Sequence, residues 1–595
     1  MPRTDGRVHA DPRRMKNDRF LAAIGLSEAD RAQLLAAASR NELTIAFETP
    51  EVVVACNDPA ATLQLNDDGL VIGPVYQSGN HQRLTALSDD TRRAILKSAG
   101  TRLFEAFWGA YVGILRTPNG ASLVRAPFGR LPCLFQRKGP GTIAASDIDL
   151  LRSASGTPFI LDFEEITRQL ALGDMRLVTT SLSGIEELRG GSRLLVEPAG
   201  MRLENVWSPW SSVAAGKSID NADDAVRRLR QQCIASVAAR TSDLSNPLLM
   251  LSGGLDSSIL AASLAADDRT FSCLNLATRD HAGDEREFAR RVAQHVKRPL
   301  EERRMAVAEY DFARIGAVRT PRPVARGYQQ LVFEMASQVA GELGCDGVVD
   351  GGGGDNVFCS LRSAAFAADC LIDPDGIHHF RQVRDDIAHL AGAARWRVSW
   401  KARRRAWQGA RPYKLQGDSR LLARDAQALA DTGAVHPWLA PPEFALPGRG
   451  AHIAILIAAQ GYVEDGPHGT KLNCIAPLVT QPLIELCLAI PSWHWFARGN
   501  NRAAARTAFE TLLPPEIAWR QGKGNPESFL FSLLERNRAA ITDHLLGGIL
   551  ASAGVIDTTA LARALRDTER LTGTTYGRIL HLLDAETWAR GIMEN

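Results

Sequence analysis

The stretch NPLLMLSGGLDSSILAASLAA, residues 246–266, constrains the fold more than any other part of the sequence. It begins with a short apolar run, Leu248–Leu251, of the kind that forms a buried parallel strand, and ends with apolar residues at helical spacing. Two glycines allow a tight turn between these runs, and two serines follow where a helix would begin with unpaired N–H groups. Such a strand–turn–helix junction is an anion site, because free amides and the helix dipole face the turn. The residues of this turn are Ser252, Gly253, Gly254, Asp256, Ser257 and Ser258.

The chain has 595 residues, which is too long for one hydrophobic core. Short β-favouring runs fill the first 210 residues, whereas helical stretches alternate with single apolar strands from Asp223 onward. The second pattern is typical of a doubly wound parallel sheet, so we expect an α/β protein. The expected strands of this sheet are Pro247–Leu251, Phe271–Ala277 and Gly347–Val349. The expected domains are a disordered extension (1–16), a strand-rich domain (17–210), a linker (211–222) and a second domain with a helical C-terminal part (223–595).

Composition argues against several classes of protein. The formal net charge is +2, so no strong overall field attracts a nucleic acid or a membrane. The longest uncharged apolar run, around Ile453–Ala459, is too short to span a bilayer, and the N-terminal stretch lacks the apolar core of a secretory signal. The nine cysteines show no metal-ligand spacing. These features favour a cytoplasmic protein with reduced thiols.

The string SGGLDSS, at residues 252–258, resembles the pyrophosphate-binding loop of ATP pyrophosphatases, which split ATP between its α and β phosphates. That superfamily includes asparagine synthetases, β-lactam synthetases and several tRNA-modifying enzymes. The resemblance implies a synthetase domain with the fold of adenine-nucleotide α-hydrolases. It also implies that ATP is used and that this loop holds the pyrophosphate.

The N-terminal part resembles the glutaminase domain of asparagine synthetases. The resemblance is carried, in order, by RAPFGRLPCLF (125–135), IAASDID (143–149) and GIEELRGGSRLLVEPAG (184–200). It implies an αββα sandwich of the N-terminal-nucleophile (Ntn) type. A glutaminase of this type needs cysteine as its first residue, but no cysteine precedes Cys56, which lies in an apolar run. We therefore expect no release of ammonia, so that the nitrogen must come from elsewhere, for instance from an amine on the substrate.

A second loop, in CDGVVDGGGGDNVF (345–358), follows another apolar strand and resembles the SGEGSDE(V/I)F loop of asparagine synthetases. Asp355 falls on the family's aspartate, and Gly353 and Gly354 are expected near the nucleotide. Asp256 and Asp355 would then face the phosphates from two strand ends of one sheet. This arrangement suits Mg²⁺, which prefers oxygen ligands and bridges phosphates. In the β-lactam branch a tyrosine of this loop helps to deprotonate the attacking amine, but Gly352 takes its place here.

Two further site predictions follow from the resemblance. Asn275 and Thr278, at the end of the second strand, are expected to line the adenosine pocket through backbone groups. Lys523 falls near the family's active-site lysine, which would neutralise charge on the α-phosphate and the tetrahedral intermediate. Arg502 and Arg506 lie one helical turn apart and are interpreted as helix-surface residues.

Two segments, PLVTQPLIELCLAIP (477–491) and GDNVFCS (354–360), resemble lasso-peptide macrolactam synthetases in particular. The resemblance implies adenylation of an Asp or Glu side chain of a precursor peptide, followed by amide closure with the N-terminal amine. That amine has an ordinary pKa of about 8, so a useful fraction is unprotonated at neutral pH. The implied partners are the precursor of this ribosomally made, antibiotic-type peptide, a leader-processing protease and a leader-recognition protein, with no membrane.

Three alternatives remain open at this point. An asparagine- or β-lactam-synthetase-type enzyme would act on a small amino acid instead of a peptide. A tRNA-modifying enzyme would use the segment RWRVSWKARRRAWQGARPYK (395–414), because interleaved basic and aromatic residues can bind RNA. A peptide-binding scaffold without activity is the third, and Asp256 and Asp355 argue against it.

Overall fold

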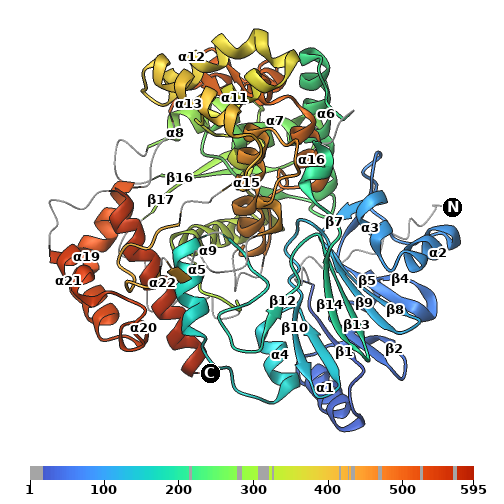
Figure 1. Ribbon diagram of the computed structural model, residues 1–595. Coiled ribbons are helices and arrows are strands. Elements are labelled where there is room, and N and C mark those ends of the chain that lie inside the picture. The colour runs from blue at the N-terminus through green and yellow to red at the C-terminus, as the bar shows by residue number, and fades with distance from the viewer. Residues whose placement is uncertain are drawn as a thin grey trace.

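The computed structural model confirms the mixed α/β class (Figure 1). The predicted extension, Thr278 and Lys523 lie outside the residues that it describes. The described residues are 18–173, 175–213, 217–277, 284–305, 320–324, 327–413, 417–426, 428–429, 436–466, 472–522, 527–566 and 573–594.

Two six-stranded antiparallel sheets form the N-terminal half. The first has the order β12-β10-β11-β1-β3-β2 and the second the order β14-β13-β9-β8-β5-β4. The strands of the first are β1 (Phe20–Ile24), β2 (Thr44–Glu48), β3 (Val52–Cys56), β10 (Leu134–Lys138), β11 (Gly141–Ala145) and β12 (Glu186–Glu187). Those of the second are β4 (Leu63–Gln64), β5 (Gly69–Ile72), β8 (Val112–Thr117), β9 (Gly120–Arg125), β13 (Ser192–Glu197) and β14 (Gly200–Asn205). A separate pair is formed by β6 (Val75–Gln77) and β7 (Phe107–Gly109).

The two large sheets pack face to face and helices cover their outer faces. Phe20, Val54 and Leu123 belong to the core between the sheets. On the first sheet, Leu21 packs outward in one cluster with Leu34 of a helix, and this helical cover explains why β1 is apolar at every position. The covering helices are α1 (Glu28–Arg40) and α4 (Ile148–Ser155) on the first sheet, and α2 (Asp89–Lys97) and α3 (Thr101–Ala106) on the second.

A five-stranded parallel sheet forms the centre of the second half, with the order β17-β16-β15-β18-β19. The three predicted strands are present as β15, β16 and β18. Helices cover both faces, because Leu249 packs among α6 and α7 whereas Leu248 packs against α9. The elements are β15 (Pro247–Met250), β16 (Ser272–Ala277), β17 (Leu300–Arg304), β18 (Gly347–Val349), β19 (Asn473–Ile475), α6 (Ala222–Arg240), α7 (Leu255–Ala266), α8 (Arg286–His295) and α9 (Gly327–Glu342). Strand order reverses beside β15, and ligands of such sheets bind at that point.

The rest of the chain is mostly helical and lies around this sheet (Figure 1). Its helices are α10 (Gly354–Val357), α11 (Ala365–Ile372), α12 (Phe380–Leu390), α13 (Arg395–Gln408), α15 (Pro447–Glu464), α16 (Gln481–Ala489), α17 (Ala503–Phe509), α18 (Pro515–Ala518), α19 (Glu527–Leu546), α20 (Ile549–Ser552), α21 (Thr558–Arg566) and α22 (Gly573–Glu594). Among the described helices, none combines the length and apolar character needed to cross a bilayer. Residues 395–408 of the basic and aromatic segment form α13, on which Trp396, Trp400 and Trp407 are exposed.

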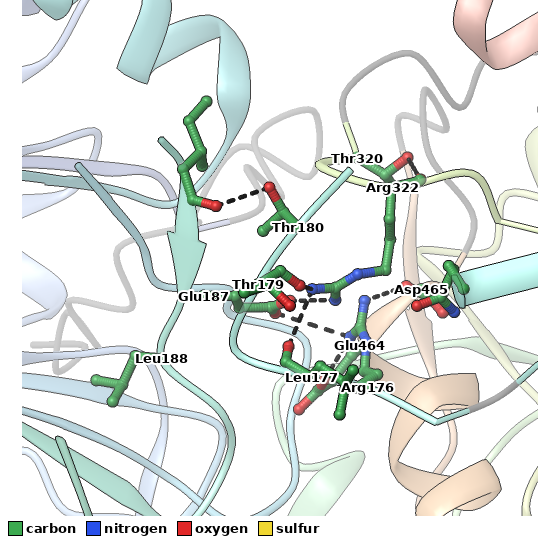
Figure 2. Close-up of polar contacts among 12 residues, drawn as sticks. Arg176, Leu177, Thr179, Thr180, Glu187, Leu188, Thr320, Arg322, Glu464 and Asp465 are labelled. Carbon is green, nitrogen blue, oxygen red and sulfur yellow. Dashed lines mark hydrogen bonds and ion pairs between the residues drawn. The ribbon is translucent and has the colours of Figure 1, made fainter. Parts of the chain in front are cut away.

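A set of six charged side chains joins the two halves, and we call it the buried ion cluster. Figure 2 labels all of its members except Arg125. Arg125 of β9 pairs with Glu187 of β12 at 2.9 Å and with Glu464 of α15 at 3.1 Å. Arg176 pairs with Glu464 and Asp465, and Arg322 pairs with Glu187. The cluster therefore consists of Arg125, Arg176, Arg322, Glu187, Glu464 and Asp465.

The charges of the buried ion cluster compensate one another. Its side chains are between 2% and 13% exposed, and three arginines face three carboxylates. Burial alone would raise the pKa of Glu187, but Arg176, Arg322 and Arg125 hold that pKa well below its ordinary value. Glu187 therefore stays ionised in the protein interior, whereas burial and the nearby Glu187 raise the pKa of Glu464 against the effect of Arg125 and Arg176. Each ion of the cluster depends on its partners.

Candidate active site

A cavity of about 490 Å³ opens at the carboxyl ends of β15 and β18, where the strand order reverses. Its walls come from the turn after β15, the glycine loop after β18, α9, α15 and the segment around α17 and α18. The two sequence motifs therefore meet at one site although they lie far apart in the chain.

The turn after β15 has the predicted strand–turn–helix form, with α7 beginning at Leu255. Gly253 has φ +74°, and a Cβ there would lie 2.5 Å from the side chain of Phe288, so the position requires glycine. Ser258 is fully buried and donates from its hydroxyl to the carbonyl oxygen of Gly254 at 2.7 Å. This bond stabilises the turn, whereas Ser252 and Ser257 line the cavity.

Asp256 and Asp355 converge on one cation, the guanidinium of Arg502. Its Nη1 lies 3.2 Å and 3.3 Å from the two carboxylate oxygens of Asp256 and also donates to Asp355. Asp256 is 10% exposed and Asp355 is 47% exposed, so the pair faces the cavity rather than the core. We call Asp256, Asp355 and Arg502 the cavity ion cluster.

The two carboxylates fit the requirements of Mg²⁺. Within the described residues, no group of three or more His, Cys, Asp or Glu side chains could hold a metal ion by itself. Mg²⁺ in nucleotide sites instead takes one or two carboxylates and completes its shell with water and substrate phosphates. Asp256 and Asp355 already meet at a single positively charged nitrogen, so they would hold such an ion together with a bound triphosphate.

Two more arginines, Arg506 and Arg520, line the cavity. Arg506 donates to the carbonyl oxygens of Asn501 and Ala518, at 3.0 Å and 2.7 Å, and burial and the nearby Arg502 lower its pKa to about 10. Arg520 stacks on the ring of Phe288 at 3.6 Å and donates to the carbonyl oxygen of Gly253 at 3.2 Å. Arg520 also pairs with Glu285 at 2.9 Å, and its bond to Gly253 holds the turn after β15 in place.

The glycine loop holds a second acidic group, Asp350, which no sequence motif singled out. Its Oδ1 accepts from the hydroxyl of Tyr462 at 2.8 Å and from the backbone N–H of Gly352 at 2.6 Å. Burial raises the pKa of Asp350 to about 6, although Tyr462, Gly352 and Arg130 oppose the rise. Both Asp350 and Tyr462 line the cavity.

The predicted site residues fall into three groups. Those that line the cavity are Ser252, Gly254, Asp256, Ser257, Asn275, Gly353 and Asp355. Gly253 lies in the turn after β15, Ser258 in the first turn of α7 and Gly354 at the start of α10, and none of the three lines the cavity. Thr278 and Lys523 are outside the described residues, so their roles stay predictions. Asn275 is buried and donates from its side-chain amide to the carbonyl oxygen of Leu251 at 2.8 Å, which joins β16 to the turn.

The interpretation of Arg502 and Arg506 as helix-surface residues is wrong. Helical spacing placed them on one face, but Arg502 precedes α17 with φ +58°, and this left-handed conformation directs it to the carboxylates. Arg506 is 4% exposed because its guanidinium binds loop carbonyls. Tyr462 carried no signal, since it reaches the glycine loop from a helix more than a hundred residues later in the chain.

Comparisons with known proteins identify the second half. Residues 228–590 match the family model described as asparagine synthase. No curated protein matches the chain. One similar solved structure is described as the allosteric regulatory enzyme of purine biosynthesis, with 9% identity and a TM-score of 0.22, over 48% of this chain and 80% of that one. Another is glutamine phosphoribosylpyrophosphate amidotransferase from B. subtilis with ADP and GMP, with 11% identity and a TM-score of 0.21, over 48% of this chain and 65% of that one.

Proposed function

Because the chain belongs to the asparagine synthase family and is an ATP-dependent amide-forming ligase, we propose that it is a macrolactam synthetase. It activates the side-chain carboxylate of an Asp or Glu in a precursor peptide as an acyl-adenylate. The N-terminal amine of the same peptide then attacks this carbonyl and closes a ring. AMP and pyrophosphate are released.

The observation that carries the proposal is an intact carboxylate pair in a protein whose nine cysteines are all buried. Cys56 lies in β3, and burial raises the pKa of its thiol to about 11. The chain therefore offers no accessible thiolate to take nitrogen from glutamine. An amide-forming ligase in this situation takes its nitrogen from an amine on the substrate.

Acidic and basic residues of the cavity have different roles in the proposed reaction. Asp256 and Asp355 would hold Mg²⁺, which neutralises phosphate charge and orients the leaving pyrophosphate when bound. The turn from Ser252 to Ser257 offers backbone amides and hydroxyls to that pyrophosphate. Arg502 and Arg506 face the same space and stabilise negative charge that develops at the α-phosphate.

A peptide substrate is supported by the likeness of residues 354–360 and 477–491 to lasso-peptide cyclases. Ring closure within a peptide costs conformational entropy, so the protein must also hold the peptide in a folded conformation. We include in the proposal a protease that frees the N-terminal amine and a protein that recognises the leader. A supply of free amine is a chemical requirement of the reaction.

The test combines the protein, ATP, Mg²⁺, a leader-processing protease and a candidate precursor peptide. We expect release of AMP and a peptide product lighter by one water molecule. Asp256→Ala should abolish both, whereas Asp267→Ala, at the exposed far end of the same helix, should retain them. Release of ADP would contradict the proposal, and turnover with a small amino acid but not with the peptide would favour the β-lactam-type alternative.

A further inference from the structure

Tyr462 fills the space that a side chain at the third residue of the glycine loop would need. A Cβ built on Gly352 would lie 1.9 Å from Cε1 and 2.0 Å from Cζ of the Tyr462 ring. No side chain fits at this position while the tyrosine stays in place. The absence of a side chain at Gly352 therefore leaves room for the Tyr462 ring, which reaches the loop from α15.

The hydroxyl of Tyr462 contacts the carboxyl group of Asp350, whose pKa is raised by burial. Asp350 is 7% exposed, and Tyr462 donates to it at 2.8 Å while both groups reach the cavity that Asp256 and Asp355 also line. The functions proposed for the carboxylate pair and the arginines make no use of Asp350 or Tyr462. An acid–phenol pair in a reactive cavity thus has no assigned role.

Charged and titratable groups also face Asp350 from the other side of the loop. A small cavity of about 30 Å³ is lined by Asp350 together with Arg130 from the turn after β9, Arg240 at the end of α6, and Cys474 of β19. Arg130 contributes a charge that favours the ionised carboxylate and so opposes the effect of burial. Arg130, from the N-terminal half, thereby influences the pKa of Asp350 in the cavity.

We propose that Tyr462 and Asp350 form a catalytic relay that takes the proton from the amine during amide formation. The inference rests on the proposed function and deepens it. Attack by the neutral amine on the acyl-adenylate carbonyl forms the C–N bond and leaves an extra proton on nitrogen. That proton passes to the phenol oxygen while the phenol proton passes to Asp350. The C–O bond to AMP then breaks, and AMP leaves with the electron pair.

Energetics favour a relay of this kind. The tetrahedral intermediate expels the amine instead of AMP if the nitrogen keeps its extra proton, so removal of this proton commits the reaction to the amide. A general base works best when its pKa lies near the working pH. The environment of Asp350 moves its pKa to about 6 and therefore towards that range.

The experiment separates activation from closure. An N-acetylated precursor can be activated but cannot close, so ATP–pyrophosphate exchange with this peptide measures adenylation alone. The free precursor measures cyclisation. For Tyr462→Phe and Asp350→Asn we expect exchange within about threefold of the parent protein and cyclisation slower by roughly 10²–10⁴-fold. Hydroxylamine, an amine that is mostly unprotonated at neutral pH, should trap the acyl-adenylate in both variants at the parent rate.

Tyr328→Phe is the matched control, because it removes another phenol from the same cavity. Among the described residues, the hydroxyl of Tyr328 contacts Met305 and no carboxylate. It should cyclise within about threefold of the parent protein. Gly352→Ala keeps the phenol but displaces its ring, so it should lose cyclisation as Tyr462→Phe does. Unchanged cyclisation in Tyr462→Phe overturns the relay and leaves the proposed function intact. An equal loss of exchange and cyclisation also overturns it, in favour of a structural role, whereas absence of exchange in the parent protein overturns the proposed function itself.

Discussion

The molecule has two clusters in which arginines meet carboxylates, and they differ in their access to water. In the buried ion cluster, between the two halves, three arginines balance three carboxylates that are 2% to 13% exposed. In the cavity ion cluster a single guanidinium serves two aspartates, and Asp355 is 47% exposed. The first cluster is electrically complete, whereas the second has an excess of negative charge that faces an open space.

This difference separates structural from functional electrostatics. Buried ions that are fully paired contribute little net stability, but the loss of one partner costs several kcal/mol because its partners remain charged. A half-exposed pair costs little to disturb because water solvates whatever remains. We therefore expect substitutions in the buried ion cluster to change stability, and substitutions in the cavity ion cluster to change catalysis.

The largest effect is expected for Asp355→Ala. Loss of this carboxylate removes half of the proposed Mg²⁺ site, so ATP cleavage should fall by roughly 10³–10⁴-fold, equivalent to about 4–5 kcal/mol of transition-state stabilisation. The midpoint of chemical unfolding should stay close to that of the parent protein. An active Asp355→Ala variant would show that Asp355 is no metal ligand. An unfolded variant would show that the cavity ion cluster, like the buried ion cluster, is needed for stability.

The next effect is on stability alone. Glu187→Gln leaves three arginines with reduced compensation in the interior, and we expect the free energy of unfolding to fall by about 3–5 kcal/mol. Glu197→Gln, at the exposed end of β13, is the matched control and should change it by less than about 0.5 kcal/mol. Urea titration followed by tryptophan fluorescence measures both. Equal stability of the two variants would mean that the buried ion cluster has no structural role.

Arg502→Ala should have an intermediate effect. Removal of one group that stabilises developing phosphate charge typically slows a reaction by about 10²-fold, or about 2.7 kcal/mol. The free energy of unfolding should change less than the activation free energy, because Asp355 is open to solvent and only Asp256, at 10% exposed, loses a cation in a buried setting. Initial rates of pyrophosphate release with saturating peptide give the comparison. A fall in stability larger than the fall in rate would place Arg502 with the structural arginines.

The smallest effect concerns pH. The three arginines hold the folded-state pKa of Glu187 below its unfolded value of about 4.5. Its ionisation thus stabilises the protein above pH 4.5, and this contribution is lost as the pH falls towards the folded-state pKa. The difference in unfolding free energy between the parent protein and Glu187→Gln should stay constant from pH 6 to about pH 5 and shrink from there to pH 3. A difference that stays constant down to pH 3 would contradict the assigned pKa direction.

Local patterns predicted much of the fold and part of the site. Apolar runs at β15, β16 and β18 indicated the parallel sheet, because buried strands need continuous apolar residues. The turn at Gly253 and the acids Asp256 and Asp355 followed from motifs that specify backbone shape and metal chemistry within a few residues. The structure brings both acids to one cavity.

Contacts between distant segments were beyond the same reasoning. Tyr462 and Asp350 meet only because α15 crosses the glycine loop, and no spacing in the sequence encodes that crossing. Arg502 had the spacing of a surface-helix residue, but it precedes α17 in a left-handed conformation, and its side chain lies in the cavity. Arg125 belonged to a motif that indicated only a resemblance to a glutaminase domain, although its guanidinium joins the two halves. Partners supplied by tertiary structure decide the role of such residues.

The buried ion cluster also constrains how the sequence can vary in evolution. Arg125, Arg176 and Glu187 come from the N-terminal half, whereas Glu464 and Asp465 come from the other half. A mutation at one of these positions leaves a charged side chain of the other half without its partner. These positions should therefore change together in related sequences or not at all. The same pairs make the N-terminal half a fixed partner of the other half, because Arg125 and Arg176 are buried against Glu464 and Asp465.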